Sequence, residues 1–250
     1  MKMIDFINYK DWKIYFLKSN NEYKKFGRKI VDKNYKVLDI LKNTERNYVA
    51  VIVLNDKKYV LKEFRSEIVI PQRRLQTFLK KGEALTTLQN SAEAMKEGIV
   101  ELVKPLIAIV NKKICIQKSY LLMEYIEGEK LKSVQDIYDV IKITKKIHNL
   151  NRYHGDLNTS NFIKTEIGMR VFDTQMKKEK LWFKRSRDLL LLKEDLLVLE
   201  LNIDVEKLYD TLPMKFEYKL GKICRKLKKI KMIQIIRDYK KKLRKKGWKI

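Results

Sequence analysis

The sequence is poor in the residues that build disulfide scaffolds, low-complexity chains and metal centres. Its 250 residues include two cysteines, two histidines, three prolines and eight glycines. So few prolines and glycines exclude collagen-like and low-complexity architectures. Cys115 and Cys224 could gain further metal ligands only from His148 and His154, and these spacings do not match a zinc site. We therefore interpret both cysteines as reduced thiols of a cytosolic protein.

The sequence also lacks a long hydrophobic run. Its longest clear apolar stretch, Tyr48 to Leu54, is far shorter than the roughly 20 residues that a membrane-spanning helix needs. Near the start of the chain, Asp5 interrupts the segment in which a signal peptide requires continuous apolar residues. We expect a protein that is neither exported nor integral to a membrane.

Acidic residues are few relative to basic ones. Lysine and arginine number 57 against 31 aspartates and glutamates, which gives a formal net charge of +26 at pH 7. Such a charge attracts polyanions: nucleic acid, anionic lipid or phosphorylated substrates. Lysine supplies 45 of the basic residues and arginine only 12, although arginine is the better bidentate phosphate ligand. Charge is therefore informative mainly where it clusters.

The residues that are present can form a folded core, because 45% are hydrophobic and 10% aromatic, too many for a disordered chain. Apolar periodicity and turn residues predict strands mainly in the first half and helices mainly in the second. In the first half we expect short strands and turns over 1–34, a three-stranded antiparallel meander over 35–64, a helix over 72–89 that Pro71 opens, and strands over 99–110, 114–117 and 120–126.

In the second half we expect helices over 136–150, 187–201 and 205–212, with a loop over 153–161 and a short hairpin over 162–172. The order of these elements predicts an α+β fold of two lobes with a cleft. We expect a β-rich N-lobe with one long helix over residues 1–126 and a helical C-lobe over residues 127–250.

The loop after the helix over 136–150 carries the clearest chemical signal. His154, Asp156 and Asn161 follow the spacing H-x-D-x-x-x-x-N, and Asp173 stands at the end of a short strand twelve residues after Asn161. This pattern is typical of kinase-type phosphoryl transfer. There, Asp156 accepts or orients the attacking hydroxyl, while Asn161 and Asp173 are oxygen ligands of the Mg²⁺ that bridges the nucleotide phosphates. A polar turn that merely caps backbone groups would not explain the further aspartate.

Phosphoryl transfer also needs a cation on the nucleotide phosphates. Lys62 lies near the end of the third strand of the meander, the position at which kinases carry the lysine that binds the nucleotide phosphates. The alternative is an ordinary surface lysine in a chain that has 45 of them. The carboxylate that holds this lysine should lie on the following helix. Glu83 is the preferred candidate, with Glu67 and Glu93 as alternatives.

The strand that runs into Gly128 fits a hinge between two lobes. Its backbone from Glu124 to Ile126 would hydrogen-bond adenine, and neighbouring apolar side chains would sandwich the base. A strand that binds no ligand is the alternative, and only the order of elements along the chain favours the hinge.

At these residues the sequence resembles the protein-kinase-like superfamily, and bacterial small-molecule kinases with a His-Gly-Asp loop more than eukaryotic protein kinases. It resembles most closely the lipopolysaccharide core heptose(II) kinases, on the segments 59–63, 70–74, 81–85 and 153–162 and over roughly residues 35–200. The resemblance implies a bilobal protein-kinase-like fold. It also implies that ATP, with Mg²⁺, phosphorylates a heptose hydroxyl of the lipopolysaccharide inner core on the cytoplasmic side of the inner membrane.

Three departures from the kinase pattern stand out. No G-x-G-x-x-G loop is present, and the turn over 42–47 contains no glycine, so backbone amides with Lys42 or Arg46 would have to cover the phosphates. Thr174 and Gln175 follow Asp173, so the phenylalanine and glycine of a D-F-G motif are absent. No A-P-E segment follows either, and the 77 residues after Asp173 leave little room for a peptide-binding segment, which disfavours a protein substrate.

The last 36 residues are strongly basic. Residues 215–250 contain 16 lysines and arginines and two acidic residues, with apolar residues at helical spacing and Trp248 near the end. We expect a basic amphipathic segment that lies on an anionic membrane surface or, as the alternative, packs its apolar side onto the domain. The first reading places the protein at the inner face of the bacterial inner membrane, with the lipopolysaccharide core on lipid A as its partner.

Two other functions remain open at this point. One is a kinase of another small acceptor, such as an aminoglycoside or a different core sugar, although cationic aminoglycosides would suit an acidic protein better. The other is a non-enzymatic basic module that binds lipid or nucleic acid. Such a module would explain the charge but not the register of Asp156, Asn161 and Asp173, so we expect no nucleic-acid partner.

Overall fold

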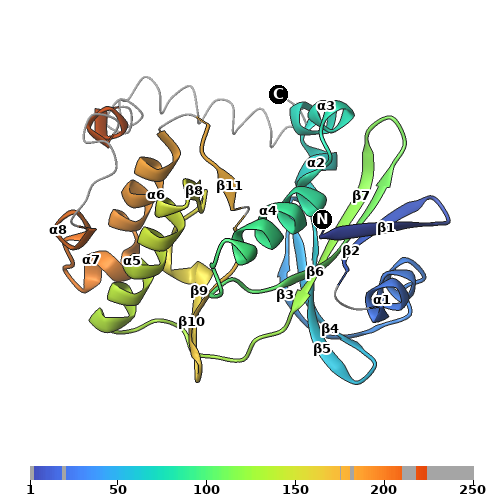
Figure 1. Cartoon of the computed structure of the whole chain (residues 1–250), viewed down its shortest axis with the longest axis horizontal. Helices are drawn as coiled ribbons and strands as arrows, with labels where there is room; N and C mark the ends of the chain where they lie inside the picture. Colours follow the sequence, from blue (N-terminus) through green and yellow to red (C-terminus); the bar gives the residue numbers. More distant parts are fainter. Residues whose placement is uncertain (1–2, 19–20, 175, 181–182, 210–217, 224–250) are drawn as a thin grey trace. The chain divides into compact units, whose positions relative to one another are not determined.

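A computed structural model of the chain describes residues 3–18, 21–174, 176–180, 183–209 and 218–223. The chain forms two compact units, residues 1–127 and 128–250. A large antiparallel sheet and several helices (Figure 1) confirm the predicted α+β class.

The first unit is built on a seven-stranded antiparallel sheet in the order β1-β2-β6-β7-β5-β4-β3. The predicted meander over residues 35–64 is confirmed as three of these strands. Tight turns rich in Asn and Asp join them, and β4 is apolar and β-branched, as a central strand requires. The strands are β1 (Ile4–Tyr9), β2 (Trp12–Leu17), β3 (Lys36–Asn43), β4 (Tyr48–Leu54), β5 (Lys57–Glu63), β6 (Pro105–Lys112) and β7 (Ile116–Glu124).

Helix α1 (Glu22–Val31) is not in the sequence prediction, which placed only short strands and turns over residues 1–34. The helical signal is present, because Tyr23, Phe26 and Ile30 are buried at helical spacing. Their ring and aliphatic carbons complete the core against β2 and β5, where the Phe26 and Tyr59 rings lie 5.4 Å apart. The prediction was wrong because lysines between these positions hide the pattern.

The single helix predicted over residues 72–89 is wrong, since the chain forms two helices there, α3 (Pro71–Leu79) and α4 (Glu83–Lys96), and a short helix α2 (Ser66–Val69) precedes them. Gly82 separates α3 from α4 with φ 88°, and a Cβ at this position would come 2.3 Å from the Ile116 Cδ1 atom. Only glycine fits such a positive φ and close approach. The strand predicted from Ile99 also begins too early, because β6 starts at Pro105.

The second unit is mainly helical. Helix α5 (Val134–Asn149) begins in a capping box between Ser133 and Asp136. The helix predicted over residues 187–201 breaks at Asp195, whose side chain caps a new helix. The remaining elements are β8 (Arg152–Tyr153), η1 (Thr159–Asn161), β9 (Phe162–Thr165), β10 (Gly168–Val171), β11 (Lys177–Lys178), α6 (Phe183–Lys193), α7 (Leu196–Glu200) and α8 (Val205–Tyr209).

Only the start of the basic C-terminal segment falls within the described residues. Residues 218–223 are helical, and Tyr218 is buried with its hydroxyl donating to Glu206 at 2.8 Å. Lys222 forms an ion pair with the same carboxylate at 2.7 Å, so this first turn packs on the second unit, although Ile223 is exposed. Residues 224–250, on which the membrane-binding prediction rests, lie outside the described residues. Among the described helices, none is long and apolar enough to cross a membrane.

Candidate active site

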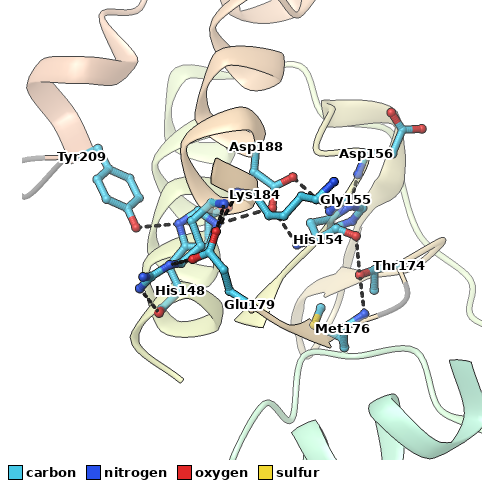
Figure 2. A network of polar contacts seen from close by, with 12 residues as sticks. His148, His154, Gly155, Asp156, Thr174, Met176, Glu179, Lys184, Asp188 and Tyr209 are labelled. Carbon is cyan, nitrogen blue, oxygen red and sulfur yellow. Dashed lines mark hydrogen bonds and ion pairs between the residues drawn. The ribbon is translucent and has the colours of Figure 1, made fainter. Parts of the chain in front are cut away.

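The loop between β8 and β9 carries Asp156 and Asn161 in a fixed arrangement. Asn161 is buried, and its side-chain nitrogen donates to the Asp156 carbonyl oxygen at 2.8 Å. This bond uses the amide nitrogen as a donor, so the side-chain oxygen remains the acceptor that could bind a cation. Asp156 itself is exposed, and Figure 2 shows its carboxylate directed away from the polar network that holds the loop.

Asp173 is joined to this loop through the β9–β10 hairpin. The backbone N–H of Phe172 donates to the Asn161 carbonyl oxygen at 3.0 Å, so Asp173 follows directly after a residue bonded to Asn161. Asp173 is exposed and has φ 51°. A non-glycine residue in this region stores backbone strain, and such residues concentrate at functional sites. Hydrogen bonds therefore join Asn161 both to Asp156 and to the residue before Asp173.

Asp188, which sequence reasoning missed, fixes the start of the loop. Its fully buried carboxylate accepts the backbone N–H groups of His154 at 2.6 Å and Gly155 at 2.9 Å (Figure 2). Gly155 has φ 96°, a conformation that glycine adopts without strain. The sequence signal was a lone carboxylate in the apolar run of α6, since a buried charge requires several donors.

The two histidines brace the loop from inside. His154 is buried against the Phe162 ring, with 6.0 Å between ring centroids, and the Asp156 N–H donates to its Nδ1 atom at 3.3 Å. Burial lowers the pKa of His154, which keeps the imidazole neutral at pH 7. His148 hydrogen-bonds with the Tyr209 hydroxyl at 2.8 Å. Both contacts give these side chains a packing and bracing role.

Thr174, the residue directly after Asp173, helps to hold the start of the loop through its hydroxyl group. Its hydroxyl donates to the His154 carbonyl oxygen at 3.0 Å and accepts the Met176 N–H at 3.2 Å. Asp195 anchors the other end of the loop, because it accepts both the N–H of Thr159 at 2.9 Å and its hydroxyl at 2.8 Å. Side-chain bonds thus hold the loop at both ends.

In the first unit, Lys62 lies on the sheet face opposite α1. Tyr59 contacts Phe26 of α1, and successive residues of a strand point to opposite faces. Lys62, three residues further along β5, therefore points to the other face. That face carries the longer helix α4, which packs on β6 and β7 (Figure 1).

A second lysine shares this face. Lys42 pairs with Val49 across β3 and β4, and Val49 pairs with Lys62 across β4 and β5. A register shift between Ile40 and Lys42 makes this possible, because without it Leu41 would stand opposite Val49. Such bulges redirect side chains next to functional sites. The two lysines are separated by two strand spacings, about 10 Å.

Glu83, the carboxylate predicted to hold Lys62, is the first residue of α4. Its side chain forms an ion pair with Arg73 at 3.0 Å. Its backbone N–H donates to a second carboxylate, the Glu67 Oε1 atom, at 2.7 Å. Arg73 was not a predicted site residue.

Glu67 connects α4 to the sheet. Its Oε2 atom accepts the Ser119 hydroxyl at 3.1 Å. Ser119 lies two residues before Leu121, the cross-strand partner of Lys62, so Glu67 approaches the same face of the sheet. Glu67 is buried, and this desolvation raises its pKa to about 6.

The predicted hinge begins where β7 ends. The Glu124 carboxylate accepts the Lys104 N–H at 2.7 Å, and the Glu124 N–H donates to the Lys104 carbonyl oxygen at 3.0 Å. This side chain thus fixes the end of the strand. Ile126 follows beyond the strand and is half-buried. Adenine binding at these residues stays a prediction.

The turn between β3 and β4, which has no glycine, is closed by its own side chains. The Thr44 N–H donates to the Asn47 carbonyl oxygen at 2.9 Å, and the Asn47 N–H donates to the Thr44 hydroxyl at 3.1 Å. Arg65 donates to the Asn43 side chain at 2.9 Å and to the Thr44 carbonyl at 3.3 Å. Two of the amides that could cradle a phosphate are therefore already bonded, so cationic side chains are needed in their place.

Comparison with known proteins places this chain in a family. The family model described as lipopolysaccharide core biosynthesis protein (WaaY) matches residues 3–231. The chain belongs to this family. A curated relative, the lipopolysaccharide core heptose(II) kinase WaaY of Escherichia coli, is 27% identical over 178 residues, which cover 68% of this chain and 77% of that protein. The family resemblance drawn from the sequence is confirmed.

In this WaaY-family chain, each of the two units carries some of the predicted site residues. The second unit holds Asp156, Asn161 and Asp173 together, and the first carries Lys62 on the sheet face that Glu67 approaches. Glu83 forms its ion pair with Arg73 instead. No cluster of three or more His, Cys, Asp or Glu side chains that could hold a metal occurs in the described part of the chain.

Proposed function

We propose that this protein is an ATP-dependent kinase that phosphorylates a heptose hydroxyl in the inner core of lipopolysaccharide, of the heptose(II) type. The observation that carries the proposal is the cluster of Asp156, Asn161 and Asp173 on a loop held rigidly from behind by Asp188. Membership of a lipopolysaccharide core biosynthesis family supports the acceptor, as does the relative named as a heptose(II) kinase.

Asp156 acts on the acceptor hydroxyl. Its exposed carboxylate receives the hydroxyl proton as the hydroxyl oxygen forms a bond to the γ-phosphorus of ATP. The bond from that phosphorus to the bridging oxygen breaks, and ADP leaves with the electron pair. The chemistry depends mainly on position and electrostatics, which is why the loop has a buried anchor at each end.

The donor set of Asn161 and Asp173 fits Mg²⁺, a hard cation that takes oxygen ligands and is commonly held by one or two protein groups with substrate phosphates. The Asn161 amide is turned by its bond to the Asp156 carbonyl, and Asp173 adds one negative charge. When bound, the ion neutralises charge on the phosphates. The scarcity of carboxylates in the cluster suits an ion shared with ATP rather than a permanently bound metal.

Lys62 and Lys42 supply positive charge for the nucleotide phosphates. They occupy one cross-strand row on one sheet face. Two backbone N–H groups of the β3–β4 turn already donate hydrogen bonds within the turn. Arg46, exposed in that turn, is a third cation. Glu83 remains the carboxylate that we propose for Lys62, and the backbone at Glu124 and Ile126 the site for adenine.

The proposed acceptor is carried on lipid A, which places the reaction at the inner face of the inner membrane. The net charge of +26 favours approach to an anionic bilayer. The basic segment over residues 215–250 is proposed to contribute to this approach.

The test is phosphate transfer by the purified protein. Dephosphorylated lipopolysaccharide core is incubated with ATP and Mg²⁺, and mass spectrometry follows the gain of one phosphate on a heptose. We expect transfer by the wild-type protein and by Glu166→Gln, an exposed carboxylate in the β9–β10 turn. We expect none by Asp156→Asn. Equal transfer by Asp156→Asn would refute the role of Asp156, and transfer to no core sugar would refute the acceptor.

A further inference from the structure

Helix α3 presents its apolar side to the solvent. The side chains of Leu75, Phe78 and Leu79 are 73%, 56% and 85% exposed, and we call these three the α3 patch. They lie at positions i, i+3 and i+4, which form one stripe of a helix. The one buried residue of α3 is Thr77, on the opposite side. A helix that packs on its domain through an apolar stripe would have the reverse arrangement.

The polar side of α3 is bound firmly to the first unit. The Thr77 hydroxyl accepts the backbone N–H of Ile116 at 3.0 Å. Lys112 donates to the carbonyl oxygens of Phe78 and Lys80, both at 3.1 Å, and so closes the end of the helix. The α3 patch is therefore held outward by bonds on the other side of the helix. Exposed apolar stripes of this kind mark interaction surfaces.

The surroundings of the α3 patch are basic. Residues 68–82 contain four lysines and arginines and no acidic residue, and residues 110–118 contain three lysines and no acidic residue. Among them Arg74, Lys80, Lys81 and Lys113 are exposed. Arg73 is the exception, because Glu83 neutralises it. Exposed apolar side chains with exposed cations close by in the sequence complement the interface of an anionic bilayer, where the apolar groups enter the headgroup region and the cations meet phosphates.

We propose that the α3 patch is a docking surface for an anionic lipid bilayer. Leu75, Phe78 and Leu79 insert at the headgroup boundary, and Arg74, Lys80 and Lys81 contact lipid phosphates around them. This surface is separate from residues 215–250 and does not depend on which acceptor the protein phosphorylates. It would bring the first unit to a membrane even if the acceptor were another amphiphile.

The test uses the full-length protein and vesicles of phosphatidylglycerol and phosphatidylethanolamine. We expect L75S/L79S to lower the vesicle partition coefficient about a hundredfold, since each Leu-sized side chain that leaves an apolar environment is equivalent to about tenfold. The matched control is L196S/L199S on α7, where the leucines are 76% and 59% exposed without being part of α3. Unchanged binding by L75S/L79S, or an equal loss in the control, would overturn the proposal.

A local measurement separates the α3 patch from the C-terminal segment. In Phe78→Trp, the additional tryptophan fluorescence should shift to the blue when vesicles are added, and brominated acyl chains should quench it. Quenching that is absent while the protein is bound would overturn the proposal. The proposal would also be overturned if the emission of the added tryptophan were already blue-shifted, relative to a solvent-exposed tryptophan, before vesicles are added. Such emission would mean that residues 224–250 or a second copy already covers the patch.

Discussion

Glu67→Gln tests how the buried charge of Glu67 affects the stability of the first unit. Glu67 accepts the Glu83 N–H with one oxygen and the Ser119 hydroxyl with the other. Glutamine has the same shape, and its amide can accept from the Glu83 N–H and donate to the Ser119 oxygen. The substitution therefore removes one buried negative charge and preserves both hydrogen bonds.

The size of the effect follows from the pKa of Glu67, which burial raises from 4.5 to about 6. The folded state holds the proton more tightly than the unfolded chain, so the contribution of Glu67 to stability is fully present below pH 4.5. It is lost as the pH rises through about 6. The loss amounts to about 2 kcal/mol at pH 7.5. Glu67→Gln should thus raise the free energy of unfolding by about that amount at pH 7.5 and by nothing below pH 4.5.

Chemical denaturation between pH 4 and pH 8, followed by circular dichroism, measures this difference. Glu45→Gln, an exposed glutamate in the β3–β4 turn, is the matched control and should show no comparable dependence on pH. If Glu67→Gln is instead less stable than the wild type at pH 7.5, the charge of Glu67 is stabilised by a cation. That result would refute the reasoning.

Three further predictions concern the rest of the site. Asp188→Ala should lower the free energy of unfolding by about 3–6 kcal/mol, because two hydrogen bonds to a buried charge disappear; an unchanged denaturation midpoint would contradict this. Asp173→Ala should weaken Mg²⁺-dependent ATP binding about tenfold in calorimetry, which follows from the loss of one charged ligand, and equal affinities would count against its role. Lys42→Met should raise the KM for ATP about tenfold with kcat retained, while Lys36→Met, on the same strand, should not; equal effects would show that only overall charge matters.

Local patterns were sufficient to predict the loop that carries Asp156 and Asn161, and the meander. The turns on either side of β4 and the β-branched residues within it follow from residue types that are adjacent in the sequence. The spacing of Asp156, Asn161 and Asp173 is likewise a local property, because one loop and one hairpin carry all three. These elements could therefore be found without knowledge of the tertiary structure.

The residues that sequence reasoning missed act across longer distances. Asp188 bonds to residues more than thirty positions earlier, and nothing in its own helix shows that partner. The break at Gly82 depends on contact with Ile116, and the position of Lys42 opposite Val49 depends on a bulge. We preferred Glu83 as the partner of Lys62 because of its place on the predicted helix. Its ion pair with Arg73 could be recognised only in the folded chain.

The central proposal is that the protein transfers phosphate from ATP to a heptose of the lipopolysaccharide core, with Asp156 accepting the proton of the heptose hydroxyl. Mass spectrometry of the core from cells that carry the wild-type protein, lack it, or carry Asp156→Asn tests this most directly. The account predicts that one heptose phosphate is lost without the protein, is restored by the wild type, and is not restored by Asp156→Asn. A core that is identical in all three strains, or one restored by Asp156→Asn, would contradict it.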